Sequence, residues 1–358
     1  MTYLDLNGRK VGPGEPAYII AEMSANHAGS YERAVEIIHA AAEAGADCLK
    51  IQTYTPDTIT IDCHNAYFEI RSGTWEKENL YELYGKACTP WEWQADLKAE
   101  TEKLGLDFLS TPFDNTAVDF LEEIGIGAYK IASFELVDLP LIEYVASKGK
   151  PMILSTGMAT LAEIDEAVRA VRGQGNRQLA LLRCASAYPA ITDQMNLRTM
   201  CNMQETFDVP VGLSDHSFGS VGAVCSVAMG GSIIEKHLCL DRAIENPDSS
   251  FSMTPSEFAQ MVRDVRQAER ALGTVSYGAT AQEASNLPFR RSVFAVKDIK
   301  AGEVLTEHNI RIIRPGYGMA PKYYPEALGQ RALCDIPYGT PVQLDMFGRG
   351  QDLRNNMA

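Results

Sequence analysis

Short apolar segments alternate with longer amphipathic segments along the first 240 residues of the chain. Many of the longer segments repeat an apolar residue every three or four positions and end in glycine, as residues 31–45 and 161–175 do, which is typical of helices. The apolar segments have the length of buried β-strands. They cover residues 17–24, 48–54, 107–113, 128–134, 151–157, 179–186, 209–215 and 232–238. Eight strand–helix units predict a fold of the α/β class, the (β/α)8 or TIM barrel.

Two regions depart from this alternation. Residues 55–90 are longer than the other connections and hold several aromatic residues, so we expect an insertion over the mouth of the barrel. The pattern lapses again between residues 276 and 288, and short β-type segments follow. We therefore predict a barrel domain at 1–280, a linker at 281–290 and a small β-rich domain at 291–350. A domain of about 60 residues is near the lower size limit for folding alone, so we expect it to dock on another surface.

Polar residues stand at the carboxyl end of every predicted strand, where barrels of this type carry their chemistry. They are Glu22, Lys50, Gln52, Ser110, Thr111, Lys130, Ser133, Ser155, Thr156, Ser186, Tyr188, Ser214, His216, Glu235 and His237. Two lysines surrounded by hydroxyl groups offer the donors that phosphate and carboxylate oxygens require. We therefore predict an anion-binding site, with purely structural ion pairs of Lys50 and Lys130 as the alternative.

Two of the six histidines, His216 and His237, end neighbouring predicted strands. Adjacent strands lie about 4.8 Å apart, so the two imidazoles could share one metal ion and leave coordination positions for substrate. The alternative is that both are hydrogen-bonded groups of the core. Asp215 could orient His216, as carboxylates often do for metal-binding imidazoles. His27 follows the first strand and could also reach the site.

Other functions are open to the same residues. A desolvated lysine such as Lys130 inside a barrel could form a Schiff base, as in class I aldolases. The two histidines that could bind a metal count against this chemistry, which needs no metal. A third interpretation is a binding protein without catalysis, and residues 291–347 lack the flat, repetitive threonine-rich face of an ice-binding module.

Composition narrows the class of protein. A formal net charge of −15 argues against general binding to nucleic acid or to anionic membranes. The eight cysteines include no CxxC pair, which is typical of reduced thiols in a cytosolic protein. The N-terminus lacks the apolar stretch of a signal peptide, and no apolar run reaches the roughly 20 residues that cross a bilayer. We expect a cytoplasmic protein that binds neither membrane nor nucleic acid.

Several motifs together resemble the sialic acid synthase family, whose members condense phosphoenolpyruvate with an N-acetylated aminosugar. The motifs are IAEMSANHAGS, LKIQTYTPDTIT, STPF, YKIASFE, ILSTGMA, GLSDHSFG, EKH and RPGYG. They occur in order over nearly the whole chain. The resemblance implies a carbon–carbon bond-forming transferase, with residues 291–350 as the family's antifreeze-like (SAF) domain.

Within this family, four stretches resemble the pseudaminic acid synthase branch: LKIQTYTPDT, residues 81–93, DHSFG and residues 245–252. N-acetylneuraminate synthases are expected to carry KHQTH where this chain has KIQTY, and asparagine at Ser186. The branch implies 2,4-diacetamido-2,4,6-trideoxy-altropyranose as acceptor and a sugar used in flagellin or surface glycans as product. The alternatives are the neuraminate and legionaminate branches, with N-acetylmannosamine or a 2,4-diacetamido-trideoxy-mannose as acceptor. Aromatic candidates for contact with the C6 methyl group are Tyr67, Phe68, Trp75, Tyr81 and Tyr84.

The resemblance also implies roles for individual residues. Phosphoenolpyruvate contacts fall on Lys50, Thr111, Lys130, Ser133, Ser155 and Ser214, to which we add Ser186 because it stands at a strand end. Sugar contacts fall on Gln52, Glu135, Tyr188 and Asp248, with Glu22 also on the sugar side. In the family, an arginine of the small domain reaches the sugar in the barrel of the dimer partner, which implies Arg314 and a domain-swapped homodimer.

The implied cofactor is a divalent metal on His216 and His237, with Mn²⁺ expected and Mg²⁺ or Co²⁺ as alternatives. The metal would polarise the aldehyde oxygen of the open-chain sugar. C3 of phosphoenolpyruvate would attack that carbon, water would add at C2, and phosphate would leave by C–O cleavage. The lysines and hydroxyl groups would orient the anionic groups. We predict catalytic roles for Glu22, Glu235 and His237, with one of the two glutamates handling the proton.

Overall fold

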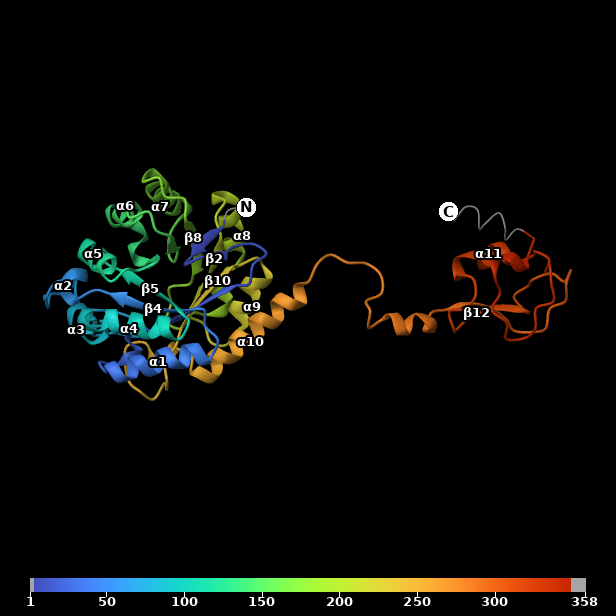
Figure 1. Ribbon diagram of the computed structural model, residues 1–358, viewed down its shortest axis with the longest axis horizontal. Coiled ribbons are helices and arrows are strands. Elements are labelled where there is room, and N and C mark those ends of the chain that lie inside the picture. The colour runs from blue at the N-terminus through green and yellow to red at the C-terminus, as the bar shows by residue number, and fades with distance from the viewer. Residues whose placement is uncertain (1–2, 349–358) are drawn as a thin grey trace. The chain divides into compact units, whose positions relative to one another are not determined.

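The computed structural model describes residues 3–348, which fold as two units divided between Gly273 and Thr274 (Figure 1). In the first unit, eight parallel strands close into a barrel in chain order, because the last strand pairs with the first. They are β3 (Tyr18–Glu22), β4 (Cys48–Thr53), β5 (Asp107–Pro112), β6 (Tyr129–Ile131), β7 (Met152–Ser155), β8 (Leu179–Cys184), β9 (Val211–Asp215) and β10 (Ile233–His237). Each predicted apolar segment contains one of these strands, so the predicted TIM barrel is confirmed.

Helices surround the strands, as Figure 1 shows. They are α1 (Tyr31–Glu43), α2 (Pro56–Ile59), α3 (Leu80–Ala87), α4 (Trp91–Lys103), α5 (Asn115–Glu123), α6 (Leu139–Ser147), α7 (Leu161–Gly173), α8 (Arg198–Phe207), α9 (Val221–Ala228) and α10 (Pro255–Leu272). The start of α7 illustrates the local cause, because Thr160 and Glu163 cap each other's backbone amides there. Within residues 3–348, no helix is both long and apolar enough to cross a membrane.

Short 3₁₀ helices mark several connections. They are η1 (Ser24–His27), η2 (Phe134–Val137), η3 (Thr192–Gln194), η4 (Ser249–Phe251), η5 (Ala284–Phe289), η6 (Pro321–Tyr323) and η7 (Leu344–Met346). Of these, η1 and η2 come directly after the barrel strands β3 and β6, so they hold residues close to the carboxyl end of the barrel. The predicted insertion holds α2 and α3, and η5 lies within the predicted linker.

The interior of the barrel is filled from its amino end. Side chains alternate between the interior and the layer under the helices, so Tyr18 and Ile20 of β3 point inward while Ile19 packs outward. A hairpin that was not predicted, β1 (Leu4–Leu6) with β2 (Arg9–Val11), adds Leu4, Leu6 and Val11 to this inner cluster. The apolar floor leaves only the carboxyl end for polar groups.

The second unit has a separate small core. The strands β11 (Ser292–Ala295) and β12 (Ile310–Ile313) pair antiparallel, and α11 (Tyr324–Ala327) follows them. Buried apolar residues such as Val293, Leu305 and Phe347 form its interior. Residues 349 and 350 of the predicted small domain lie outside the described residues.

Candidate active site

Four charged side chains form one buried network at the carboxyl end of the barrel. The Lys50 Nζ lies 2.7 Å from Glu22 Oε2 and 3.6 Å from Glu235 Oε1, and the Lys130 Nζ lies 3.5 Å from Glu235 Oε2. The Ser214 hydroxyl donates to Glu235 Oε1 over 3.4 Å. Both lysines are therefore ion-paired, which was the alternative to an anion-binding site. The ion pairs also face a cavity, however, so the lysines remain accessible to a ligand.

The strand register places these groups together. Along β3 the inward side chains are Tyr18, Ile20 and then Glu22, so the same period of two runs from apolar to charged. Glu22 is aligned with Lys50 on one neighbouring strand and with His237 on the other. Inward-facing positions are thus apolar near the amino end of each strand and polar at its carboxyl end. Together these inward polar side chains form a ring at the carboxyl end of the barrel, which we call the polar ring.

Hydroxyl groups complete the lysine environment. The Lys50 Nζ donates to Thr111 Oγ1 over 3.2 Å, and the Lys130 Nζ donates to Ser155 Oγ over 2.7 Å. The Ser133 hydroxyl accepts a hydrogen bond from the Gly157 amide. These groups surround a cavity of about 60 Å³. The predicted site residues that line it are Glu22, Lys50, Gln52, Thr111, Lys130, Ser133, Ser155, Tyr188, Ser214, His216, Glu235 and His237.

The two carboxyl groups have opposite pKa shifts. Burial opposes ionisation of Glu235, but the charges of Lys130 and Lys50 outweigh burial and lower its pKa. For Glu22, burial outweighs the attraction of Lys50, and the pKa is raised. Burial also lowers the pKa of Lys130. Neighbouring acids whose pKa values are driven apart are suited to different roles, so Glu235 is the fixed anion and Glu22 the group that can carry a proton.

The two predicted metal ligands lie side by side, with ring centroids 5.3 Å apart. The His216 Nδ1 lies 3.3 Å from the Ala185 carbonyl oxygen, and donation to this oxygen leaves Nε2 free to bind a ligand. The His237 Nδ1 is buried and has no hydrogen-bond partner among the described residues. Burial, followed by the His216 charge, holds the pKa of His237 well below its usual range, so its ring is neutral.

These properties fit a metal ion held by two imidazoles. A buried nitrogen without a partner is costly unless a ligand satisfies it, and metals bind the neutral ring. Within residues 3–348, no group of three or more His, Cys, Asp or Glu side chains forms a closed metal site. Two protein ligands would leave the remaining positions to water and substrate. His216 has a competing proton: against the effect of burial, the Cys184 thiolate raises its pKa, and a bound metal would replace this proton.

The predicted role of Asp215 is wrong. Its Oδ2 accepts a hydrogen bond from the Lys236 Nζ over 2.7 Å, and its Oδ1 accepts from the Ser217 amide and hydroxyl. The Lys236 Nζ also donates to the carbonyl oxygens of Ser217 and Gly219. Asp215 and Lys236 occupy the strand positions that face away from the interior. Asp215 therefore fixes the loop that follows His216 and does not orient the imidazole.

His27 does not reach the cavity either. Its Nδ1 accepts from the Gly29 amide over 3.0 Å, and its Nε2 lies 3.3 Å from Thr89 Oγ1. The ring packs edge-on against Trp93, and burial lowers its pKa to about 4. His27 is a satisfied core histidine that links η1 to the start of α4.

Ser110 and Thr156 were also expected at the site and point away from it. The Ser110 hydroxyl bonds the Thr53 hydroxyl over 2.6 Å, and the Thr156 hydroxyl donates to the Leu182 carbonyl oxygen. Each is adjacent in sequence to a residue that does line the cavity. The alternation along a strand explains both corrections, because the neighbouring position faces the helices.

The predicted sugar-side residues lie next to the ring. The Gln52 Nε2 donates to Glu22 Oε1 over 3.0 Å and to the Ser24 hydroxyl over 2.9 Å. The Asp248 Oδ2 accepts from the Ala25 amide and lies 3.8 Å from the His237 Nδ1. Asp248 is buried close to the histidines but does not line the cavity itself.

Three further predicted residues lie outside the cavity lining. Glu135 follows β6 in η2, and burial raises its pKa to about 7. The Ser186 hydroxyl lies 3.5 Å from the Sγ of Cys184, which itself lines the cavity. Arg314 belongs to the second unit, directly after β12. Its contact with a sugar in another subunit remains a prediction.

Sequence reasoning missed Cys184 as a site residue. Its Sγ lines the cavity and lies 3.8 Å from the His216 Nδ1. Burial raises the pKa of the thiol, but the charge of His216 and the hydrogen bond with it outweigh burial and lower the pKa to about 6. The alternation of side chains along β8 could have identified Cys184, because Ala180, Leu182 and Cys184 occupy the inward positions of this strand. Phe251 was also not placed at the site, and its ring packs on both histidines. Trp75, one of the aromatic candidates for contact with the C6 methyl group, packs on Tyr188 and Phe251.

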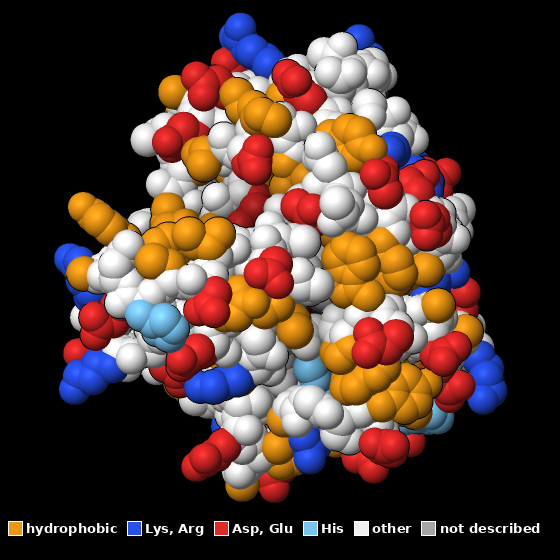
Figure 2. Space-filling model, turned by 90° about the vertical axis from the view of Figure 1, so that its left-hand side faces the viewer, with side chains coloured by type: hydrophobic (Ala, Val, Ile, Leu, Met, Phe, Trp, Pro, Cys, Tyr) orange, Lys and Arg blue, Asp and Glu red, His pale blue; other side chains and the backbone are white. Residues whose placement is uncertain are grey.

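Exposed apolar side chains border the mouth of the barrel. They come from four consecutive connections, after β6, β7, β8 and β9, and are between 57% and 62% exposed. They are Phe134, Val137, Met158, Leu161, Ile191, Phe218 and Val221. Figure 2 views the unit from the side on which α2 and α3 lie in Figure 1, and hydrophobic groups are spread over this face among acidic ones. We call these seven residues the mouth crescent.

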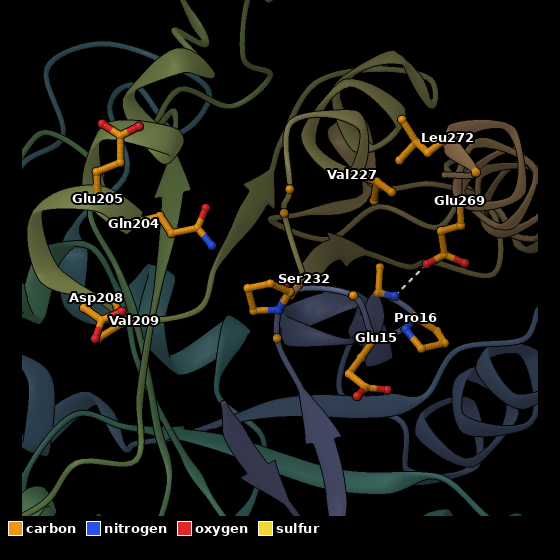
Figure 3. Close-up of a pocket in the computed structure, with 17 residues that line it drawn as sticks. Glu15, Pro16, Gln204, Glu205, Asp208, Val209, Val227, Ser232, Glu269 and Leu272 are labelled. Carbon is orange, nitrogen blue, oxygen red and sulfur yellow. Dashed lines mark hydrogen bonds between the residues drawn. The ribbon is translucent and has the colours of Figure 1, made fainter. Parts of the chain in front are cut away.

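A larger cavity, of about 690 Å³, lies at the opposite end of the barrel (Figure 3). It is lined by the segments that precede β3, β9 and β10 and by the end of α10. Its charged lining residues, such as Glu15, Glu205 and Glu269, are all acidic, and Glu269 accepts a hydrogen bond from the Ala17 amide. An anionic substrate would be repelled there. Size favours this cavity, but chemistry places the candidate active site in the smaller one.

Comparisons with known proteins show the family to which the chain belongs. A model of the NeuB family matches residues 37–277, and a model of the SAF domain matches residues 290–348. The pseudaminic acid synthase of Campylobacter jejuni is 45% identical over 330 residues, covering 92% of this chain and 96% of that protein. The N,N'-diacetyllegionaminic acid synthase of Legionella pneumophila is 35% identical over 347 residues, covering 94% and 96%. The crystal structure of N-acetylneuraminic acid synthetase from Leptospira borgpetersenii is 30% identical with a TM-score of 0.71, covering 80% of this chain and 95% of that one.

Proposed function

The chain belongs to the NeuB family, and from this premise we propose that it condenses phosphoenolpyruvate with 2,4-diacetamido-2,4,6-trideoxy-altropyranose to give pseudaminic acid and phosphate. The observation that carries the proposal is the pair of buried lysines facing a cavity that also holds two neutral-capable imidazoles. The lysines can bind the anionic phosphoenolpyruvate, and the imidazoles can hold a metal ion that activates the sugar's carbonyl group.

The choice of acceptor is supported by relatedness. The chain is 45% identical to a pseudaminic acid synthase and 35% identical to a diacetyllegionaminic acid synthase, over similar lengths. The motif KIQTY at residues 50–54 favours the same branch. Legionaminate synthesis is the second candidate, because its acceptor is also a 2,4-diacetamido-trideoxy sugar.

Phosphoenolpyruvate would bind between the two lysines. Lys50 approaches both Glu22 and Glu235, and Lys130 approaches Glu235, so the two ammonium groups lie together where an anion can bind. The hydroxyl groups of Thr111 and Ser155 already accept from these ammonium groups and can rotate to donate to substrate oxygens. Ser133, Ser186 and Ser214 would add donors around the same anion. Binding would thereby hold the enol for attack on the sugar.

Glu22 is the proton handler that the geometry favours. Burial raises the pKa of Glu22, whereas the charges of Lys130 and Lys50 lower the pKa of Glu235, so Glu22 takes up a proton more readily than Glu235. The Gln52 amide fixes the Glu22 carboxyl group from the other side. In the overall reaction, C3 of the enol attacks the aldehyde carbon, water adds to C2, and the C–O bond to phosphate breaks. Glu22 would accept and return the proton moved in these steps.

His216 and His237 would hold the divalent metal, which we propose to be Mn²⁺, with Mg²⁺ or Co²⁺ as alternatives. When bound, the metal supplies Lewis-acid activation of the sugar's aldehyde oxygen. The protein's own contribution is to present the His237 ring neutral and to leave the His216 Nε2 free for a ligand, while a bound metal would replace the competing proton of His216. Asp248, 3.8 Å from the His237 Nδ1, would contact the sugar.

We also propose a domain-swapped homodimer. The mouth crescent exposes apolar side chains from four consecutive connections, and contiguous exposed apolar surface marks interaction sites. The second unit exposes apolar side chains of its own, including Phe289, Tyr317 and Tyr338. The SAF unit of a second copy would cover the mouth and bring Arg314 to the sugar.

Complementation between two inactive variants tests the swap. In a swapped dimer of one His237→Ala chain and one Arg314→Ala chain, one site combines an intact barrel with an intact arginine. We expect the purified mixed dimer, co-expressed with two tags, to regain about half of the normal turnover, while both homodimeric variants stay impaired. Arg314→Ala alone should raise the KM for the sugar about tenfold, with the KM for phosphoenolpyruvate little changed. No regain in the mixed dimer would place Arg314 in its own barrel or outside the site.

Phosphate release tests the function itself. The chelated protein is given phosphoenolpyruvate with each of three sugars: the diacetamido-trideoxy altrose, the diacetamido-trideoxy mannose and N-acetylmannosamine, each with and without Mn²⁺. We expect rapid release only with the altrose derivative and metal. Release with the mannose derivative alone would assign the chain to legionaminate synthesis, and release with N-acetylmannosamine alone to neuraminate synthesis. Borohydride inactivation in the presence of a carbonyl substrate would instead indicate a Schiff base on Lys130.

We further propose that the protein acts in the cytoplasm. All eight cysteines are free, and each lies within the described residues. Several lie in the interior, such as Cys48 and Cys239, without a partner thiol. Disulfides persist in oxidising compartments, so this usage suits a reducing one.

A further inference from the structure

Two aromatic side chains, Tyr188 and Phe251, pack on the candidate metal ligands, and a third, Trp75, packs on these two. The Tyr188 ring centroid lies 4.4 Å from that of His216, and the Phe251 centroid lies 5.1 Å from that of His237. Trp75 packs on both, at 5.4 Å from Tyr188 and 6.4 Å from Phe251. The three rings come from the insertion after β4, the connection after β8 and the helix η4 after β10. We call Trp75, Tyr188 and Phe251 the aromatic wall.

The structure distinguishes Trp75 from the other aromatic residues of the insertion. Its Nε1–H donates to the Pro247 carbonyl oxygen over 2.8 Å, and the neighbouring Thr74 hydroxyl donates to the Tyr188 carbonyl oxygen. Tyr67 is 87% exposed, and Tyr81 bonds Asp57 at the surface. Of Tyr67, Trp75 and Tyr81, Trp75 is the one that contacts the segments carrying the other two rings.

The size of the cavity requires a bound sugar to meet this wall. About 60 Å³ holds only a few water molecules, whereas sites for small organic ligands usually have several hundred cubic ångströms. The floor and sides of the site are barrel strands and cannot retreat. Trp75 is only partly buried and belongs to an insertion outside the barrel. An acceptor next to His216 and His237 must therefore displace or press against the aromatic wall.

Two members of the wall, Trp75 and Phe251, offer little to a hydroxyl group, whereas Tyr188 carries a phenol hydroxyl and lines the cavity. The single polar atom of Trp75 is already used by Pro247, and Phe251 has none. A sugar hydroxyl forced against these rings would lose its water without gaining a partner, whereas a methyl group would gain contact area. Trp75 and Phe251 would therefore favour a sugar carbon that carries a methyl group over one that carries a hydroxyl group.

We propose that the aromatic wall, with Trp75 as its decisive member, selects acceptor sugars that carry a methyl group at C6 over those with a hydroxymethyl group. The inference rests on the proposed function, because it concerns the acceptor of that reaction. Binding of phosphoenolpyruvate, which occupies the lysine side of the site, does not involve the wall.

Selectivity between two acceptors is the decisive measurement. Values of kcat/KM are compared for the altrose derivative and for the same sugar with a hydroxyl group at C6, with the KM for phosphoenolpyruvate measured in parallel. Trp75→Ala should lower the preference for the 6-deoxy sugar about tenfold or more, the range of discrimination that apolar pockets reach. Trp75→Phe keeps the apolar ring and loses only the Nε1–H anchor, so it should keep most of the preference.

Tyr67→Ala is the matched control, because it removes an exposed aromatic ring from the same insertion. It should leave the preference and both KM values unchanged, and a thermal melt shows that each variant is folded. If Trp75→Ala lowers kcat/KM equally for both sugars, or does not lower it, the proposed selectivity of the aromatic wall is wrong while the proposed function stands. If the wild-type protein instead uses only N-acetylmannosamine, whose C6 carries a hydroxyl group, both proposals fall.

Discussion

Replacing His237 with alanine will lower turnover by roughly a thousandfold or more and leave the barrel folded. Lewis-acid activation is worth several kcal/mol in the transition state, and about 4 kcal/mol corresponds to a thousandfold change in rate. The variant should also lose affinity for Mn²⁺ in isothermal titration, a readout that does not depend on turnover. The fold should persist because the His237 Nδ1 bonds no other group among the described residues, so its removal leaves no donor or acceptor without a partner.

His39→Ala is the matched control for this experiment. His39 is largely exposed and pairs with Glu100 on the outside of the barrel, so its loss should affect neither turnover nor Mn²⁺ binding. Two results would contradict the assignment. One is normal turnover by the chelated wild-type protein, and the other is a His237→Ala variant that binds Mn²⁺ as tightly as the wild type.

Replacing Glu235 with glutamine will both destabilise the barrel and abolish most activity. Glu235 is the carboxylate that both Lys50 and Lys130 approach, so its neutralisation leaves excess buried positive charge. Removing one partner of a buried ion pair costs about 3 kcal/mol or more, which corresponds to a fall in Tm of about 6–12 °C for a unit of this size. Differential scanning calorimetry measures the fall.

The pH dependence of this loss has a defined sign. The lysines lower the pKa of folded Glu235, so its ionised form contributes stability above the usual glutamate range and loses it as the pH falls through the folded pKa. The difference in Tm between wild type and Glu235→Gln should therefore be largest near neutral pH and shrink in acid. Inorganic phosphate should stabilise the variant more than the wild type, because an anion between the lysines would replace the lost charge.

Glu100→Gln is a suitable control for Glu235→Gln. Glu100 pairs with His39 and Lys103 at the surface, where ion pairs contribute little to stability. A Glu235→Gln protein as stable as this control would show that the two lysines do not depend on Glu235. The network would then have to be neutralised by Glu22 or by loss of a lysine proton.

Much of the site could be predicted from the sequence because it repeats one local rule. Polar residues end each apolar strand, and barrels of this type expose that end to substrate, so Lys50, Lys130, His216 and His237 could be placed together before their contacts were seen. The errors came from single positions. Ser110 and Thr156 were included and Cys184 was omitted, because the alternation was not continued through the last residue of each strand.

Contacts across the barrel and between distant segments could not be derived in this way. Lys50 meets both Glu22 and Glu235 only because β10 closes on β3 beside β4. The same closure decides the opposite pKa shifts of the two glutamates, since Glu235 lies between two lysines whose charges outweigh its burial, whereas Glu22 pairs, within the described residues, with Lys50 alone. Asp215 turned from the histidine to Lys236 for a related reason: both face outward from adjacent strands.

The sequence by itself determined the barrel, its polar ring and the two histidines, because period-two and helical patterns are local and survive without knowledge of the partners. Only the tertiary structure decided which charges pair, which of the two carboxyl groups has the raised pKa and which aromatic residue of the insertion packs on Tyr188 and Phe251. Trp75 is brought to Tyr188 and Phe251 across separations of more than a hundred residues. Such contacts depend on chain closure and on the conformation of long connections, and no local pattern encodes either.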